Sequence, residues 1–95
     1  MNIKVQYFGY IKNMLNKKED NITLNEGAPL SELLDNLAKI NGPAFRREVY
    51  KHGLTDVKTG FSVTVNGVFI GQLGGVNTKL KDGDSVVLMS LMSGG

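Results

Sequence analysis

One amphipathic helix dominates the hydrophobic pattern of this chain. Its apolar residues follow the i, i+3, i+4, i+7, i+8 spacing that places them on a single helix face: Leu30, Leu33, Leu34, Leu37 and Ala38. Acidic residues lie in the first turns, where the helix dipole favours them, and the sequence Asn-Gly-Pro at 41–43 ends the helix. The stripe predicts that this helix lies on a hydrophobic core.

Alternating segments on both sides of the helix predict β-strands. The strands are expected at 3–8, 21–25, 61–65, 68–70 and 85–91. The first two should be antiparallel because the link between them is short, and Asn66-Gly67 predicts a two-residue type I′ hairpin turn. Residues 10–15 predict one helical turn, Pro43 can open a second short helix over 43–52, and 16–20 and 71–75 are expected as loops.

This order of elements predicts an α+β fold. We expect one mixed sheet of four to five strands, crossed by one main helix with a short second helix beside it. At 95 residues the chain fits one domain, which we assign to residues 1–90. Residues 91–95 lack periodicity and end in two glycines, which predicts a flexible tail.

Composition excludes several classes of function. The chain has no cysteine, so disulfide scaffolds, thiolate catalysis, zinc–thiolate sites and iron–sulfur clusters are excluded. A net charge of +2 with two arginines is no nucleic-acid footprint. No apolar run approaches the roughly 18–20 residues that span a bilayer, and the N-terminus shows no targeting pattern. We therefore expect a cytoplasmic protein that binds neither nucleic acid nor membrane.

Candidate catalytic or metal-binding side chains are few. His52 is the one histidine, so it cannot build a histidine triad or a multi-histidine metal site, and we expect a charged residue at a helix end. Asp82 and Asp84 flank Gly83, which is typical of a turn rather than of a calcium loop. The glycine-rich residues 71–75 lack the Lys-Ser/Thr of a phosphate-binding loop. The sequence therefore predicts a non-catalytic protein without a metal site.

The chain's own carboxylate remains as a reactive group. Two glycines make the narrowest possible peptide, so a tail ending in Gly94 and Gly95 can enter a tight enzyme channel. Five extended residues reach roughly 15–18 Å. The alternative is that Gly-Gly is a frayed end or a cloning remnant.

The ordered set of motifs resembles a known family. The motifs are IKVQYFG at 3–9, EGAPLSELL at 26–34, VTVNG at 63–67, LKDGD at 80–84 and the diglycine at 94–95. Together they resemble the MoaD/ThiS group of sulfur carriers, with their ubiquitin-like β-grasp fold, and MoaD more closely because of the second helical segment. The small archaeal modifier proteins belong to the same MoaD-like group.

The resemblance implies a mechanism in partnership with other proteins. An ATP-dependent activating enzyme of the ubiquitin-activating type would adenylate the Gly95 carboxylate, and sulfur transfer would convert it to a thiocarboxylate. The sulfur would pass to a pterin precursor inside the large subunit of molybdopterin synthase, during molybdenum-cofactor synthesis. The chain would be the small, non-catalytic subunit and would bind no cofactor, since ATP is used by the partner.

Two alternatives remain open. MoaD-like proteins commonly carry prolines shortly before the diglycine, whereas this chain has Ser90-Leu91-Met92-Ser93. The departure leaves room for a small archaeal modifier, joined through Gly95 to lysines of target proteins. A non-covalent β-grasp binding module, in which the diglycine has no role, is the other alternative.

The last strand also predicts a partner surface. Its residues alternate between two faces, and a single helix can cover one face of the sheet. An exposed apolar row is a recognition surface more readily than an accident, and Met suits a surface that repacks against several partners. We predict a partner-binding patch of Phe8, Val87, Met89, Leu91 and Met92. Loops or the second helix covering this row would be the alternative.

Overall fold

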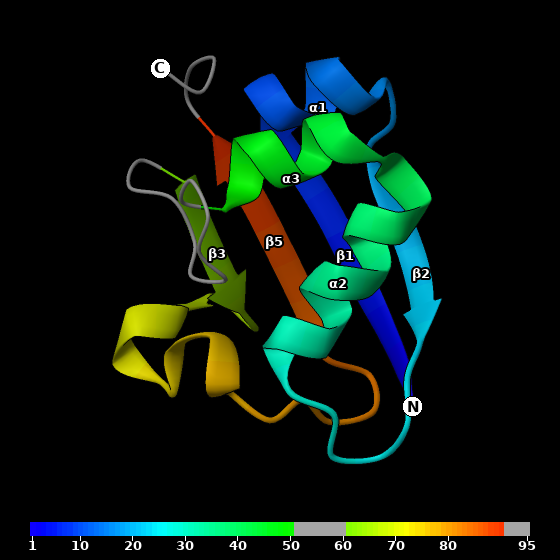
Figure 1. Cartoon of the computed structure of the whole chain (residues 1–95). Coiled ribbons are helices and arrows are strands. Elements are labelled where there is room, and N and C mark those ends of the chain that lie inside the picture. Colours follow the sequence, from blue (N-terminus) through cyan, green and yellow to red (C-terminus); the bar gives the residue numbers. More distant parts are fainter. Residues whose placement is uncertain (51–60, 91–95) are drawn as a thin grey trace.

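The structure, a computed structural model, describes residues 1–50 and 61–90. Its centre is a five-stranded mixed sheet with the strand order β2-β1-β5-β3-β4 (Figure 1). The strands are β1 (Asn2–Gly9), β2 (Glu19–Thr23), β3 (Phe61–Val65), β4 (Val68–Phe69) and β5 (Ser85–Ser90). The predicted α+β fold with one mixed sheet is confirmed.

In the middle of the sheet, the first strand, β1, pairs with the last strand, β5. β5 runs parallel to β1, in the register Val5↔Val86, and antiparallel to β3, in the register Val63↔Leu88. β2 pairs antiparallel with β1, as the short link between them predicts. The two sheet edges are β2 and the two-residue β4, and such a short edge strand offers little backbone for unwanted pairing.

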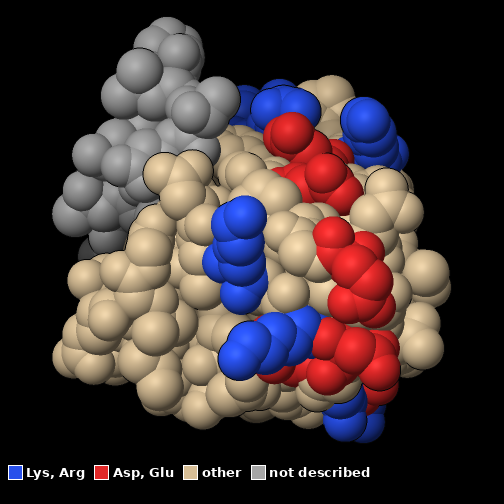
Figure 2. All heavy atoms as spheres, turned by 90° about the horizontal axis from the view of Figure 1, so that it is seen from below, with Lys and Arg blue, Asp and Glu red and all other residues tan. Residues whose placement is uncertain are grey.

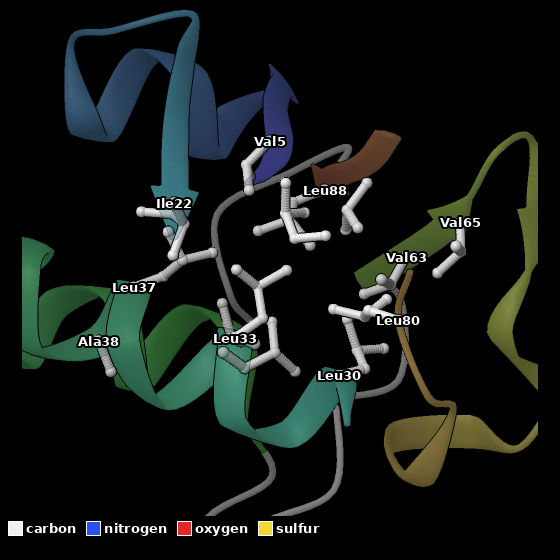
Figure 3. Packing of buried hydrophobic residues seen from close by; sticks show 14 of the residues in the cluster. Val5, Ile22, Leu30, Leu33, Leu37, Ala38, Val63, Val65, Leu80 and Leu88 are labelled. Atoms are coloured by element: carbon white, nitrogen blue, oxygen red, sulfur yellow. The ribbon is translucent and has the colours of Figure 1, made fainter. Parts of the chain in front are cut away.

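Helices α2 (Leu30–Asn41) and α3 (Pro43–Val49) lie across one face of this sheet (Figure 1). The apolar side chains of α2 point toward the strands, where they meet residues such as Val63 and Leu88 (Figure 3). Leu30, Leu33, Leu34 and Leu37 are fully buried, so the predicted stripe is the helix side of the core. Phe45 and Val49 of α3 are buried with them.

The turn between β3 and β4 has the predicted type I′ character. Asn66 and Gly67 both have positive φ, at 51° and 84°, as this turn requires. The Asn66 side chain also ties the hairpin to β5: its Oδ1 accepts the Ser85 N–H at 2.9 Å and its Nδ2 donates to Asp84 at 2.9 Å.

Three predicted boundaries were wrong. β2 begins at Glu19 and ends at Thr23, two residues before the predicted span, because the backbone ladder with β1 starts at polar residues that looked like a loop. β4 ends at Phe69, and Ile70 opens the 3₁₀ turn η1 (Ile70–Gln72), which buries its side chain. A second turn, η2 (Gly75–Asn77), replaces the end of the predicted glycine-rich loop.

Two further predictions concern segments that extend beyond the described residues. Helix α3 ends at Val49, and Tyr50 has the extended backbone angles of a residue past a helix end. Of the residues predicted to extend it, 51 and 52 lie outside the described part. β5 is described as far as Ser90, so Leu91 and the tail assigned to 91–95 are not covered. Within the described ranges, each helix is too short or too polar to cross a bilayer.

Candidate functional site

The candidate site begins where the described chain ends. Gly94, Gly95, Leu91 and Met92 lie outside the described residues, so their predicted roles stay predictions. Ser90 is the last described residue, and it lies between two neighbours in the sheet, paired with Gly9 of β1 and Phe61 of β3. Ser90 therefore lies in the middle of the sheet rather than at an edge.

Ser90 is held from the helix side of the sheet. Its side chain is buried, at 3% exposure, and its Oγ accepts the backbone N–H of Ile11 at 3.0 Å. Ile11 belongs to α1 (Tyr10–Leu15), the short helix that packs on the ends of β1 and β5. Backbone and side chain of Ser90 are thus both fixed.

The two faces of β5 differ in burial. Val86 and Leu88 are fully buried under the helices, whereas Val87 and Met89 face the other side and are half-buried. Phe8 lies beside Met89 in the parallel register and is 46% exposed. The structure thus places Phe8, Val87 and Met89 together on the face opposite α2, which we call the open face.

Sequence reasoning missed a fourth apolar residue of the open face. Phe69 is 54% exposed and pairs with Thr64, which in turn pairs with Val87 across β3 and β5. A signal was available, because a two-residue turn at Asn66-Gly67 fixes Thr64 opposite Phe69. Thr64 alternates with the buried Val63 and Val65, so Phe69 had to lie on the opposite side from them.

Charge is unevenly distributed along the chain around this face. No Lys, Arg, Asp or Glu occurs between residues 59 and 78, a run that contains β3, β4, η1 and η2. Figure 2 shows an uncharged area on the side where β4 and the two 3₁₀ turns lie, next to a region where acidic and basic side chains mix. The open face therefore borders an uncharged end of the molecule.

The other candidate residues have structural roles or lie outside the described part. Asp84 accepts the Lys81 N–H at 2.8 Å and so closes the predicted turn, whereas Asp82 accepts the Asn2 N–H at 2.6 Å and ties this turn to the start of β1. The described residues contain no group of three or more His, Asp or Glu side chains that could hold a metal ion. His52 lies outside the described residues.

Two tyrosines have raised pKa values that follow from packing. Burial, and then the Asp20 carboxylate that accepts the Tyr7 hydroxyl at 2.7 Å, raises the pKa of Tyr7 well above its usual range. Lys17 binds the same carboxylate at 2.9 Å. Burial, and then the charge of Asp35, raises the pKa of Tyr50 to about 12. Neither hydroxyl is activated as a base or nucleophile, because a raised pKa keeps the proton in place.

Solved structures share this architecture. The small archaeal modifier protein SAMP1 of Haloferax volcanii superposes with a TM-score of 0.78 at 16% identity, over 100% of both chains. Urm1 of Trypanosoma brucei gives 0.80 at 22% identity, over 99% of this chain and 95% of its own. A putative molybdopterin converting factor subunit 1 of Pyrococcus furiosus gives 0.67 at 24% identity, over 97% and 99%. At these identities the likeness establishes the ubiquitin-like β-grasp fold.

The sequence comparisons identify the family. No curated protein matches the chain in sequence. The family model described as "ThiS family" matches residues 5–95, which is nearly the whole chain and includes both glycines of the predicted tail. The chain therefore belongs to the ThiS family of ubiquitin-like β-grasp proteins.

Proposed function

We propose that this protein is a sulfur carrier whose Gly95 carboxylate is adenylated and then converted to a thiocarboxylate, with molybdopterin synthesis as the pathway served. The observation that carries the proposal is the family match, which runs through Gly94 and Gly95. Family members are small carriers rather than catalysts. The side chains that the structure describes agree with such a role, since the Asp82 and Asp84 carboxylates bind backbone N–H groups and the buried tyrosines hold their protons.

The chemistry needs two displacements and no redox change. A Gly95 carboxylate oxygen attacks the α-phosphorus of ATP, forming a P–O bond while the bond to pyrophosphate breaks and pyrophosphate leaves. A hydrosulfide ion then attacks the acyl carbon, forming a C–S bond while the C–O bond to AMP breaks and AMP takes the electron pair. Glycine, without a Cβ, leaves the acyl carbon open to both partners.

The body of the protein would present the tail and dock on the activating enzyme. The open face offers Phe8 on β1, Val87 and Met89 on β5 and Phe69 on β4, with Thr64 of β3 between Val87 and Phe69. Aromatic residues and Met are the types enriched in protein interfaces. Ser90, the last described residue, directly follows Met89 in β5, so the docked face lies next to the residue from which the tail begins in the sequence. The partner we propose is an adenylyltransferase of the ubiquitin-activating type.

Mass spectrometry of the intact protein tests the carrier function. The full chain is incubated with an activating enzyme of the same organism, ATP and sulfide. We expect its mass to rise by the difference between a sulfur and an oxygen atom. A variant lacking Gly95 is the control and should fold normally but stay unmodified. An unchanged mass for the wild type would contradict the proposal and favour a non-covalent binding module.

A protein modifier is the second candidate, supported by the full-length superposition on SAMP1 and by the absence of proline in Ser90-Leu91-Met92-Ser93. In that case a lysine amine attacks the activated Gly95 carbonyl, an amide bond forms, AMP leaves and the amine loses a proton. Diglycine remnants on lysines of cellular proteins after proteolysis would favour the modifier. Sulfur delivery to a pterin precursor, in the presence of a molybdopterin synthase large subunit, would favour the carrier.

A further inference from the structure

The start of α1 lacks a cap of its own. Gly9 occupies the N-cap position and has no side chain, so the first N–H groups of the helix need acceptors from elsewhere. Ser90, which lies 79 residues away from Ile11 in the sequence, supplies one: its Oγ accepts the Ile11 N–H at 3.0 Å in a buried position. Ile11 is the second residue of the helix, which is where an N-cap oxygen ordinarily binds. Ser90, the last residue of β5, thus caps the start of α1.

Gly9 makes this contact possible. Its φ is +72°, a conformation that favours glycine, and a Cβ atom at this position would collide with the carbonyl oxygen of Ser90. Among the described glycines with positive φ, Gly9 is the one at which an added Cβ would collide with backbone. A Cβ at Gly27, with φ of +76°, would have nothing within 4 Å. Gly9 therefore allows the ends of β1 and β5 to approach each other closely, in addition to forming the turn into α1.

The contacts around Ser90 fix it on several sides. β1 and β3 flank it in the sheet, α1 binds its hydroxyl, and the Ile11 side chain beside it is fully buried. Ser90 as a whole is 3% exposed, and the hydrogen bond that its hydroxyl accepts is buried. We call this set of contacts, made by Gly9, Ile11 and Ser90, the clamp.

We propose that the clamp is a positioning device for the reactive terminus: it fixes the place and direction of the chain at Ser90, the last residue before 91–95, and Ser90 is a positioning residue for activation of Gly95. This inference rests on the proposed function. A reactive group on a tether reacts at an effective concentration that depends on the tether's length and on how its base is oriented. Releasing Ser90 removes the fixed direction of the chain at the end of β5, so productive placement of Gly95 becomes rarer.

Steady-state ATP–pyrophosphate exchange with the activating enzyme tests the clamp in the full chain. Ser90→Ala removes the acceptor, while Ser90→Thr retains a hydroxyl. Because Ser90 faces away from the open face, docking should not change. We expect Ser90→Ala to lower kcat by roughly threefold or more at an unchanged KM. Ser90→Thr should recover most of the loss.

A matched control separates positioning from stability. Leu24→Ala removes a buried side chain after β2. Leu24 bonds to Met1 at the start of β1, whereas Ser90 pairs with Gly9 at the other end of that strand, so the variant lowers stability without touching the clamp. At a temperature where all variants are folded, Leu24→Ala should have wild-type kcat. NMR order parameters of the Met89 and Ser90 amides should fall in Ser90→Ala and stay unchanged in Leu24→Ala, which gives a readout independent of activity.

The outcomes distinguish the clamp from the function on which it rests. Wild-type exchange with equal kcat in Ser90→Ala would overturn the clamp and leave the proposed function standing. An equal fall of kcat in Leu24→Ala would assign Ser90 to stability alone and overturn the clamp as well. Absence of exchange with the wild type would overturn both.

Discussion

Gly9 illustrates how a single missing side chain can determine a contact between distant parts of the chain. Its backbone is in the left-handed region, and the space where a Cβ would lie is taken by the Ser90 carbonyl oxygen. Two separate costs therefore oppose any other residue: the strained φ, and the collision with backbone that cannot move without disturbing the β1–β5 ladder.

Comparison with a second glycine isolates the collision. Gly9→Ala should lower the free energy of unfolding by more than the about 1–3 kcal/mol expected for a strained backbone alone. Gly27→Ala, with nearly the same φ and open space around it, should show the backbone cost alone. Urea denaturation measures both. Equal losses of unfolding free energy in the two variants would contradict a collision between the Cβ at position 9 and the Ser90 carbonyl oxygen.

Tyr7 gives a prediction about pH. Its pKa is raised in the folded protein, so below pH 10 the hydroxyl keeps its proton in both states and the Tyr7–Asp20 contact contributes fully. Above pH 10 the unfolded chain loses this proton and the folded chain does not, so stability falls as pH rises. The stability difference between wild type and Tyr7→Phe should therefore be smaller at pH 11 than at pH 8. A difference that is constant in urea titrations at the two pH values would contradict this.

At the scale of elements, α2 holds the helix layer on the sheet. Leu33 is fully buried and points between the strands (Figure 3), whereas Ile40 on the same helix is 56% exposed. Leu33→Ala should cost about 2–5 kcal/mol through lost contacts and the cavity left behind. Ile40→Ala should change stability by less than about 0.5 kcal/mol. Thermal and urea unfolding of the pair provide the measurement, and similar losses would mean that α2 packs on another face.

Strongly patterned elements could be predicted from sequence, and weakly patterned ones could not. The leucine stripe of α2 and the alternation of β3 each have one buried face, so periodicity alone located them. β2 is an edge strand with a single buried residue, Ile22, so its polar start resembled a loop. Its position is determined by pairing with β1, which is a property of the folded chain.

The site was predicted to a similar degree. Alternation along β5 separated the half-buried Val87 and Met89 from the buried Val86 and Leu88. The Ser90–Ile11 hydrogen bond could not be predicted, because it joins residues 79 apart through the parallel pairing of β1 with β5. A local window of the sequence contains no information that Ile11 and Ser90 become neighbours.

At the scale of the whole molecule, the two sides of the sheet differ: one carries the core, and the other, the open face, is the side that we propose for docking. Met89→Asp places a charge on the open face, where desolvating it on docking is costly. We expect binding to the activating enzyme to weaken at least about tenfold, which corresponds to about 1.4 kcal/mol. Stability should change little because Met89 is half-buried and outside the core.

Ile40→Asp is the matched control for this variant. It places the same charge on an exposed residue of α2, on the helix side of the sheet. Its binding affinity, measured by calorimetry beside that of Met89→Asp, should equal that of the wild type. Weakening by Ile40→Asp alone would place the docking surface on the helices.

The central pairing of β1 with β5 also has a consequence for how the protein is made. β1 is synthesised first but pairs with β5, which is synthesised last. The central part of the sheet therefore cannot form while the ribosome is still adding β3 and β4. Until then, the apolar sides of β1 and α2 lack the contacts that β3 and β5 provide. Such non-local closure is slow compared with helix formation, so apolar surface stays exposed for longer than in a fold built from local contacts.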